Sequence, residues 1–120
     1  MPYDNPGGVV YGTGNFTDPR RFCDAIWNKA HEIGLPLDLI TAEYDAPQFE
    51  FTLTFGPAVE HLDTVVLFRQ MAREIALDHG VILSFLPKPI PGKGGSGLHV
   101  NLSFTNADGR NALAKSDWGN

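Results

Sequence analysis

The chain has 120 residues, of which 42% are hydrophobic and 19% charged, enough apolar material for one domain with a single core. Nine Lys and Arg against 14 Asp and Glu give a net charge of −5, and the basic residues form no cluster, so the composition disfavours nucleic-acid binding. Cys23 is the single cysteine, which excludes an intrachain disulfide, and no apolar run reaches the roughly 20 residues of a membrane helix; we therefore expect a cytoplasmic protein.

The first predicted element is a helix that follows Asp18 and Pro19 and ends near Ile33. Asp can cap free N–H groups, and Pro loses no hydrogen bond in a first helical turn. Gly34 suits a left-handed stop. One apolar stripe runs along this segment and consists of Phe22, Ile26, Ala30 and Ile33. We expect the stripe to face a sheet.

Two strands are predicted next, over residues 37–44 and 48–55. In the first, Leu37, Leu39 and Thr41 alternate with Asp38, Ile40 and Ala42. In the second, Phe49, Phe51, Leu53 and Phe55 point to one face, and Gln48, Glu50, Thr52 and Thr54 point to the other. Residues 45–47 are short enough for a hairpin-like reversal, which would place Glu43 near Glu50.

A second and longer helix is predicted from Gly56 and Pro57 to near Gly80. Its stripe consists of Ala58, Leu62, Val65, Phe68, Ala72, Ile75 and Ala76. Residues 81–86 are then expected to form a strand that Pro87 stops, followed by a loop rich in Gly and Pro over residues 87–97. Another strand is predicted over residues 98–104, where Leu98, Val100, Leu102 and Phe104 alternate with His99, Asn101 and Ser103. Residues 106–109 are predicted to form a turn.

Together these elements predict an α+β fold, a mainly antiparallel sheet of about four strands with the two helices packed on its apolar face. We expect residues 1–120 to form a single domain, with residues 1–15 as a loose N-terminal arm and residues 112–120 as a truncated C-terminal tail. The open polar face and the unpaired strand edges favour self-association, so a homo-oligomer is expected.

Three residues on the polar faces or ends of the predicted strands, Glu43, Glu50 and His99, are candidate metal ligands. Two carboxylates and one imidazole can hold a hard divalent cation, and carboxylate oxygen suits Mg²⁺ or Mn²⁺. Each residue alone reads more simply as a solvated face residue. Two carboxylates held close together on a half-buried sheet repel each other, however, and such a pair usually has a cation or a proton.

The loop around Lys88 and the glycines after it would let backbone N–H groups approach an anion. The loop does not have the spacing GxxxxGK[ST], and no amphipathic helix follows it, so a nucleotide P-loop is not supported. By itself this segment reads as a flexible turn.

Several segments in this order resemble the catalytic domain of the glutamine synthetase family. They are Glu43-Tyr44-Asp45-Ala46-Pro47-Gln48-Phe49-Glu50, the next helix with Asp63, Phe85-Leu86-Pro87-Lys88-Pro89, and Gly95-Ser96-Gly97-Leu98-His99. The resemblance runs from about Phe16 to Asn111. It implies an ATP-dependent ligase of nitrogen metabolism, in which two Mg²⁺ or Mn²⁺ ions help to transfer phosphate to a side-chain carboxylate, and ammonia or an amine attacks the acyl phosphate.

The resemblance also implies roles for individual residues. Glu43 and Glu50 look like ligands of the metal that meets the carboxylate substrate, which would be glutamate or a related acid. His99 looks like a ligand of the metal that meets the phosphates of ATP. Gly95 resembles the loop residue that touches the amino-acid substrate, and Ser103 matches a position near the nucleotide.

The sequence also departs from the family pattern. Asn101 stands where the family commonly has His, Gly94 where it commonly has Asn, and Thr41-Ala42 where it has His-His. An amine other than ammonia is therefore a conceivable acceptor. The family's further glutamates, its phosphate-binding arginines and its small β-rich domain are not in this sequence, so we expect a fragment that is inactive alone. The alternative is a non-catalytic assembly or regulatory module derived from the same fold.

Overall fold

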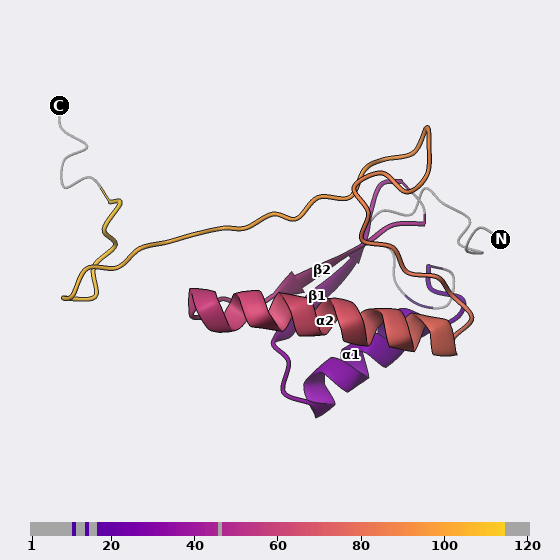
Figure 1. The fold of residues 1–120 in the computed structure, drawn as a ribbon, viewed down its shortest axis with the longest axis horizontal. Coiled ribbons are helices and arrows are strands. Elements are labelled where there is room, and N and C mark those ends of the chain that lie inside the picture. The colour runs from indigo at the N-terminus through magenta and orange to yellow at the C-terminus, as the bar shows by residue number, and fades with distance from the viewer. Residues whose placement is uncertain (1–10, 12–13, 15–16, 46, 115–120) are drawn as a thin grey trace.

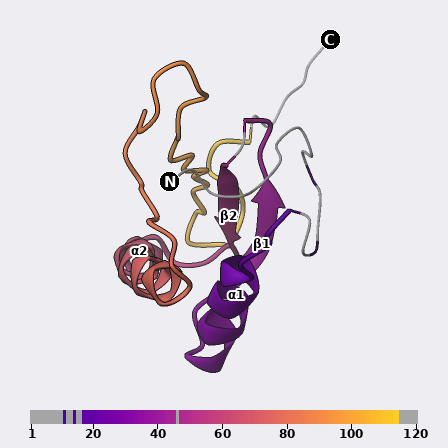
Figure 2. The same cartoon turned by 90° about the vertical axis from the view of Figure 1, so that its right-hand side faces the viewer.

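The computed structural model describes residues 11, 14, 17–45 and 47–114. The elements follow in the order α1 (Phe22–Glu32), β1 (Leu37–Ala42), β2 (Phe49–Leu53) and α2 (Ala58–Asp78), as Figure 1 shows. β1 and β2 form an antiparallel pair, and the two helices lie against it (Figure 2). The α+β class is thus confirmed. The prediction of about four strands is not confirmed, because only β1 and β2 form a ladder within the described ranges.

Helix α1 starts three residues later than its entry signal. Arg21 precedes the helix with a left-handed backbone (φ 56°) and makes no side-chain cap. The buried carboxylate of Asp18 accepts a hydrogen bond from the Cys23 N–H at 2.7 Å and thereby supplies the predicted cap from further upstream. Gly34 (φ 72°) ends the helix as predicted.

Replacing Asp18 with alanine is expected to destabilise the fold by about 1 kcal/mol, because one helix N–H loses its acceptor inside the protein. Asp18→Asn keeps an oxygen acceptor and should cost less. Urea unfolding followed by circular dichroism measures both. Equal stability of wild type and Asp18→Ala would show that this cap contributes nothing.

A bulge in β1 changes which residues face the core. Leu37 pairs with Leu53 and Leu39 with Thr52, so β1 carries one more residue than β2 over this stretch. As a result Leu37 and Ala42 are both buried although simple alternation puts them on opposite faces, and Leu39 is 53% exposed. The bulge thus shifts the alternation of residues 39–42 by one position relative to Leu37.

The core lies between the two helices and one face of the strand pair. The Phe49 ring packs edge-on against Phe22 of α1 at 5.4 Å between centroids, and Phe51 packs against Phe68 of α2 at 5.1 Å. Because Phe49 and Phe51 point to the same face of β2, both helices cover that face, as predicted. Three alanines of the helices are fully buried and let α1 and α2 approach each other: Ala30, Ala72 and Ala76.

Some residues at the ends of the predicted stripes are exposed rather than buried. Ile33 is 55% exposed, Leu62 is 59% exposed and Phe55 is 91% exposed. Phe55 lies beyond the end of β2, where the chain turns toward α2, so it no longer follows the alternation of the strand.

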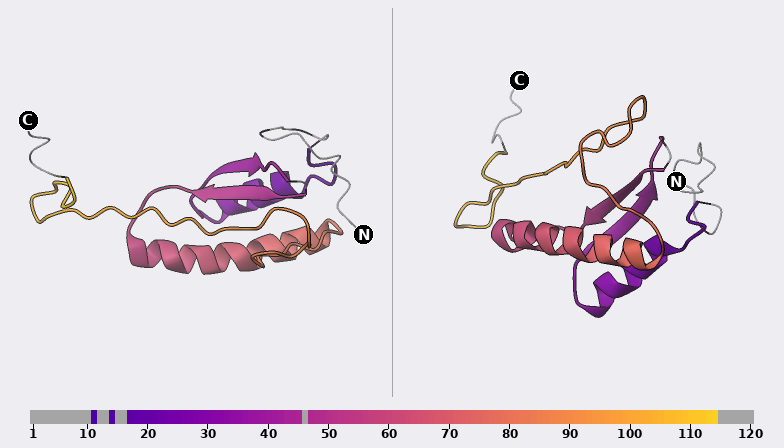
Figure 3. Two further views of the ribbon diagram at one scale, coloured as in Figure 1. Left: turned by 90° about the horizontal axis from the view of Figure 1, so that it is seen from above. Right: turned by 45° about the vertical axis from the view of Figure 1, so that its right-hand side comes forward.

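After α2 the chain is mostly irregular. Residues 81–86 and 98–104 have no strand partner among the described residues, and the second segment runs outward from the helices and strands (Figures 1 and 3). Its apolar side chains are accordingly exposed: Leu98, Val100, Leu102 and Phe104. The predicted turn is confirmed, since the Gly109 N–H donates to the Asn106 carbonyl at 2.9 Å and Thr105 bridges Asn111.

Two further expectations concern the ends of the chain and the membrane. Residues 1–10, 12–13, 15–16 and 115–120, which include most of the expected arm and tail, lie outside the described residues. None of the described helices combines the length and the apolar character that a membrane crossing requires.

Candidate functional site

The register of the strand pair places Glu43 and Glu50 on the same face. Thr41 lies opposite Glu50, and just beyond the ladder the Glu43 N–H donates to the Gln48 carbonyl at 2.9 Å. Glu43 and Thr41 are two positions apart and share a face, so Glu43 and Glu50 are diagonal neighbours. Phe49 packs into the core from the opposite face, which leaves the two carboxylates on the side away from the helices.

The two carboxyl groups interact directly. A side-chain hydrogen bond with Glu43, followed by partial desolvation and the Glu43 charge, raises the pKa of Glu50. The charge of His99 and a hydrogen bond from Thr52 act in the opposite direction on this pKa. Two carboxylates this close repel each other, and a bound divalent cation would offset that repulsion.

His99 belongs to the segment after α2, and its charge lowers the pKa of Glu50. Its ring lies over Gly97, where an added Cβ would be 3.4 Å from the imidazole Nε2. As the side chains stand, no set of three His, Cys, Asp or Glu groups in the described part of the chain forms a metal-holding cluster. The donor types suit Mg²⁺ or Mn²⁺, while a closed set of ligands needs His99 to approach further or a ligand from elsewhere.

The turn between β1 and β2 also contacts the glycine-rich loop. The Gln48 side-chain amide donates to the Gly95 carbonyl at 2.9 Å, and the Asp45 carboxylate accepts the Gly94 N–H. Lys93 Nζ lies 3.8 Å from Asp45 Oδ1. These contacts place Gly95 beside the carboxylate-bearing turn. The pattern of the sequence did not single out Asp45 or Gln48, and no local signal pairs them with residues nearly 50 positions away.

Ser103, the candidate nucleotide-binding residue, lies apart from this group. It is exposed in the outward-running segment, and no hydrogen bond or ion pair joins it to Glu43, Glu50 or Gly95 in the described ranges. Its predicted role stays a prediction.

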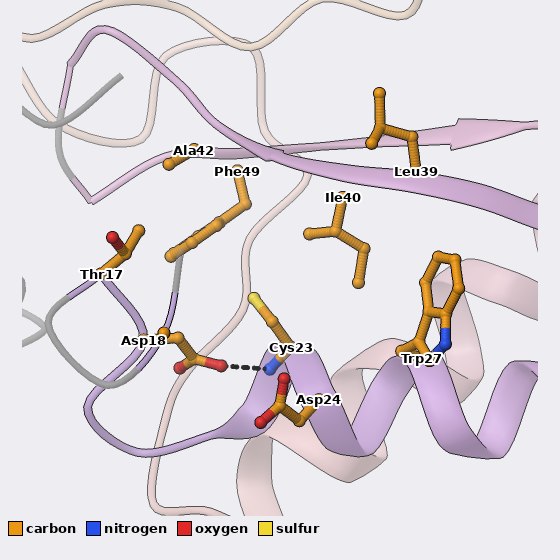
Figure 4. A pocket seen from close by; sticks show the side chains of 10 residues that line it. Thr17, Asp18, Cys23, Asp24, Trp27, Leu39, Ile40, Ala42 and Phe49 are labelled. Atoms are coloured by element: carbon orange, nitrogen blue, oxygen red, sulfur yellow. Dashed lines mark hydrogen bonds between the residues drawn. The ribbon is translucent and has the colours of Figure 1, made fainter. Parts of the chain in front are cut away.

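A hollow in the described chain lies elsewhere, between the start of α1 and β1. It has a volume of about 230 Å³ and is lined by Thr17, Asp18, Cys23, Trp27 and Ile40 among others (Figure 4). Burial, and then the charge of Asp18, raises the pKa of the Cys23 thiol. The thiol is thus protonated at neutral pH, which agrees with a packing role rather than a nucleophilic one.

Comparison with known proteins identifies the family. Residues 4–119 match the family described as glutamine synthetase, catalytic domain. Type-1 glutamine synthetase 1 of Dictyostelium discoideum is 35% identical over 88 residues, which are 73% of this chain and 18% of that protein. The glutamate–methylamine ligase of Methyloversatilis universalis is 31% identical over 112 residues, 93% of this chain and 25% of that protein.

A solved structure has the same fold. The structure of apo GmaS without ligand matches 96% of this chain and 28% of its own chain, with a TM-score of 0.81 and 23% sequence identity. The chain thus spans between about a fifth and a quarter of the length of the curated relatives compared above. Since the family match covers nearly every residue, the chain belongs to the glutamine synthetase family and corresponds to part of its catalytic domain.

Proposed function

We propose that the chain is a segment of an ATP-dependent carboxylate–amine ligase, and that it contributes metal-binding carboxylates to the active site. The observation that carries the proposal is the strand pairing that sets Glu43 and Glu50 side by side on the face away from the helices. In this segment Glu43, Glu50 and His99 would hold Mg²⁺ or Mn²⁺. The metal would neutralise charge on the phosphate being transferred from ATP to the substrate carboxylate.

The remaining residues would serve binding. Gly95 is held beside the carboxylate-bearing turn by Gln48 and would meet the amino-acid substrate, glutamate or a related acid. Ser103 would lie near the nucleotide once the outward-running segment is paired with further sequence. We propose that the segment acts within a cytoplasmic homo-oligomer. We also propose that it has no turnover alone, because it spans only about a fifth to a quarter of the length of the related ligases.

The acceptor is ammonia or a small amine. The similarity to a protein named glutamate–methylamine ligase over 93% of this chain supports an amine as one of the two candidates. Asn101 and Thr41-Ala42, which stand in place of family histidines, are in keeping with an acceptor other than ammonia.

The test is a calorimetric titration of the whole chain with Mn²⁺. The wild type is expected to bind Mn²⁺ weakly and saturably. His99→Ala should weaken binding by about tenfold or more, because it removes a ligand. His31→Ala is the matched control, since His31 is an exposed histidine on α1 and bonds the Trp27 carbonyl. Absence of binding at millimolar Mn²⁺, or equal loss in both variants, would contradict the proposal.

A non-catalytic module for partner contact is the second candidate. It is favoured by the exposed alternating side chains of residues 98–104, among them Leu98 at 70% and Leu102 at 64% exposure. The complete reading frame separates the two candidates. Upstream glutamates and downstream arginines in frame support the ligase, and a stop codon after Asn120 supports the module.

A further inference from the structure

We infer that Asp45 and Gln48 are positioning residues, which clamp residues 93–96 against the turn between β1 and β2 and thereby fix the start of the segment that carries His99. The effect on the metal site rests on the proposed function, whereas the clamp itself does not. The clamp joins two segments nearly 50 positions apart.

Gln48 holds two segments at once. Its backbone carbonyl accepts the Glu43 N–H at 2.9 Å and so extends the strand pairing to the first carboxylate. Its side-chain amide donates to the Gly95 carbonyl at 2.9 Å and reaches the Ser96 hydroxyl at 3.5 Å. The same residue therefore connects the backbone of Glu43 to the loop.

Asp45 holds the other side of the loop. Its carboxylate accepts the Gly94 N–H, and Lys93 Nζ lies 3.8 Å from its second oxygen. The Lys93 and Asp45 side chains are 51% and 40% exposed, so the ion pair is screened and adds little. The hydrogen bond from Gly94 to a charged acceptor is the stronger of the two contacts.

Close approach of the loop depends on glycine. A Cβ added to Gly94 would lie 3.2 Å from both Cβ and Oδ2 of Asp45. A Cβ added to Gly95 would lie 2.9 Å from the Pro87 carbonyl, which already accepts the Ser96 N–H at 2.7 Å. Any side chain at Gly95 would collide with the backbone of Pro87. The contacts of Asp45 and Gln48 with the loop therefore require glycine at these positions.

The clamp reaches His99 through a short connection. Ser96 and His99 are three positions apart, so the extended chain between them spans about 10 Å. The imidazole rests against Gly97, with Nε2 3.4 Å from the place of an added Cβ. Release of residues 93–96 would therefore let the segment that carries His99 move relative to the strand pair. Residues 98–104 have no strand partner in the described chain, so the contacts of residues 93–96 with Asp45 and Gln48 tie this segment to the turn between β1 and β2.

Amide hydrogen exchange and trypsin cleavage test the clamp without any metal. Gln48→Ala and Asp45→Ala are expected to speed exchange of the Gly94 and Ser96 amides by about tenfold and to speed cleavage after Lys93. Trypsin does not cut after Lys88 because Pro89 follows.

Asp45→Asn keeps an acceptor for Gly94 and should retain slow exchange. The controls are Gln70→Ala, which removes a Gln side chain bonded to Glu74 on α2, and Asp108→Ala, which removes an Asp bonded to the Arg110 N–H in another turn.

Mn²⁺ affinity tests what the clamp does. Gln48→Ala and Asp45→Ala should weaken Mn²⁺ binding by about tenfold, the effect of losing a residue that supports a metal ligand without touching the metal. Asp45→Asn should bind nearly as the wild type does. If Asp45→Asn binds as weakly as Asp45→Ala, loss of charge explains the effect and the positioning role is overturned. Unchanged loop exchange in Gln48→Ala overturns the clamp. A wild type that binds no Mn²⁺ overturns the proposed function, and the exchange comparison then still decides the clamp.

Discussion

Glu50→Ala is expected to weaken Mn²⁺ binding by about 100-fold or more. Loss of a residue that only supports a ligand costs about 10–100-fold in metal affinity, and Glu50 would be a direct ligand. Its carboxyl group shares a hydrogen bond with Glu43, so the variant leaves Glu43 without the second oxygen donor of the pair. Calorimetric titration with Mn²⁺ measures the change.

The fold should survive this substitution. Glu50 is exposed, and its interaction with Glu43 includes like-charge repulsion, so removal of one carboxylate should leave the free energy of unfolding unchanged or slightly higher. Glu74→Ala is the control, because Glu74 is an exposed helix residue that accepts from Gln70. If wild type and Glu50→Ala bind Mn²⁺ with equal affinity, Glu50 is not a ligand of the metal.

Phe68→Ala is expected to destabilise the fold by about 3–5 kcal/mol, a large part of the stability of a domain of this size. Phe68 is 5% exposed, and its ring contacts Phe51 of β2 at 5.1 Å and Phe85 at 6.3 Å between centroids. The substitution therefore opens a cavity where α2, the strand pair and the following segment meet. Urea unfolding followed by tryptophan fluorescence or circular dichroism gives the change in free energy.

Phe55→Ala provides the matched control for this experiment. Phe55 is 91% exposed, so its removal should change the free energy of unfolding by no more than about 0.5 kcal/mol. A loss below about 1 kcal/mol in Phe68→Ala would mean that the packing of α2 on the strands contributes little to stability.

The sequence pattern predicted correctly those features that depend on contacts between residues close together in the chain. The cap from Asp18, the stop at Gly34 and the hairpin that brings Glu43 to Glu50 all depend on residues a few positions apart. The bulge that exposes Leu39 depends on how β1 pairs with β2, and alternation along one strand does not contain that information.

The other two predicted strands, residues 81–86 and 98–104, show that alternation alone does not make a strand. Residues 98–104 have the alternation of a strand, yet a strand forms only with a partner, and the described chain offers none. The same applies to the site. The hairpin fixes Glu43 and Glu50, whereas His99 and Gly95 depend on a loop held by Asp45 and Gln48, contacts that no sequence spacing predicts.

The central claim is that Glu43, Glu50 and His99 lie around one cation-binding cleft, and paramagnetic broadening by Mn²⁺ tests it most directly. The chain has four histidines, so each imidazole signal can be followed by NMR during a substoichiometric Mn²⁺ titration. The His99 signals should broaden first, and the same titration of Glu50→Ala should leave them sharp. If His99 stays sharp in the wild type while His31 or His79 broadens, the cation binds elsewhere and the claim is wrong.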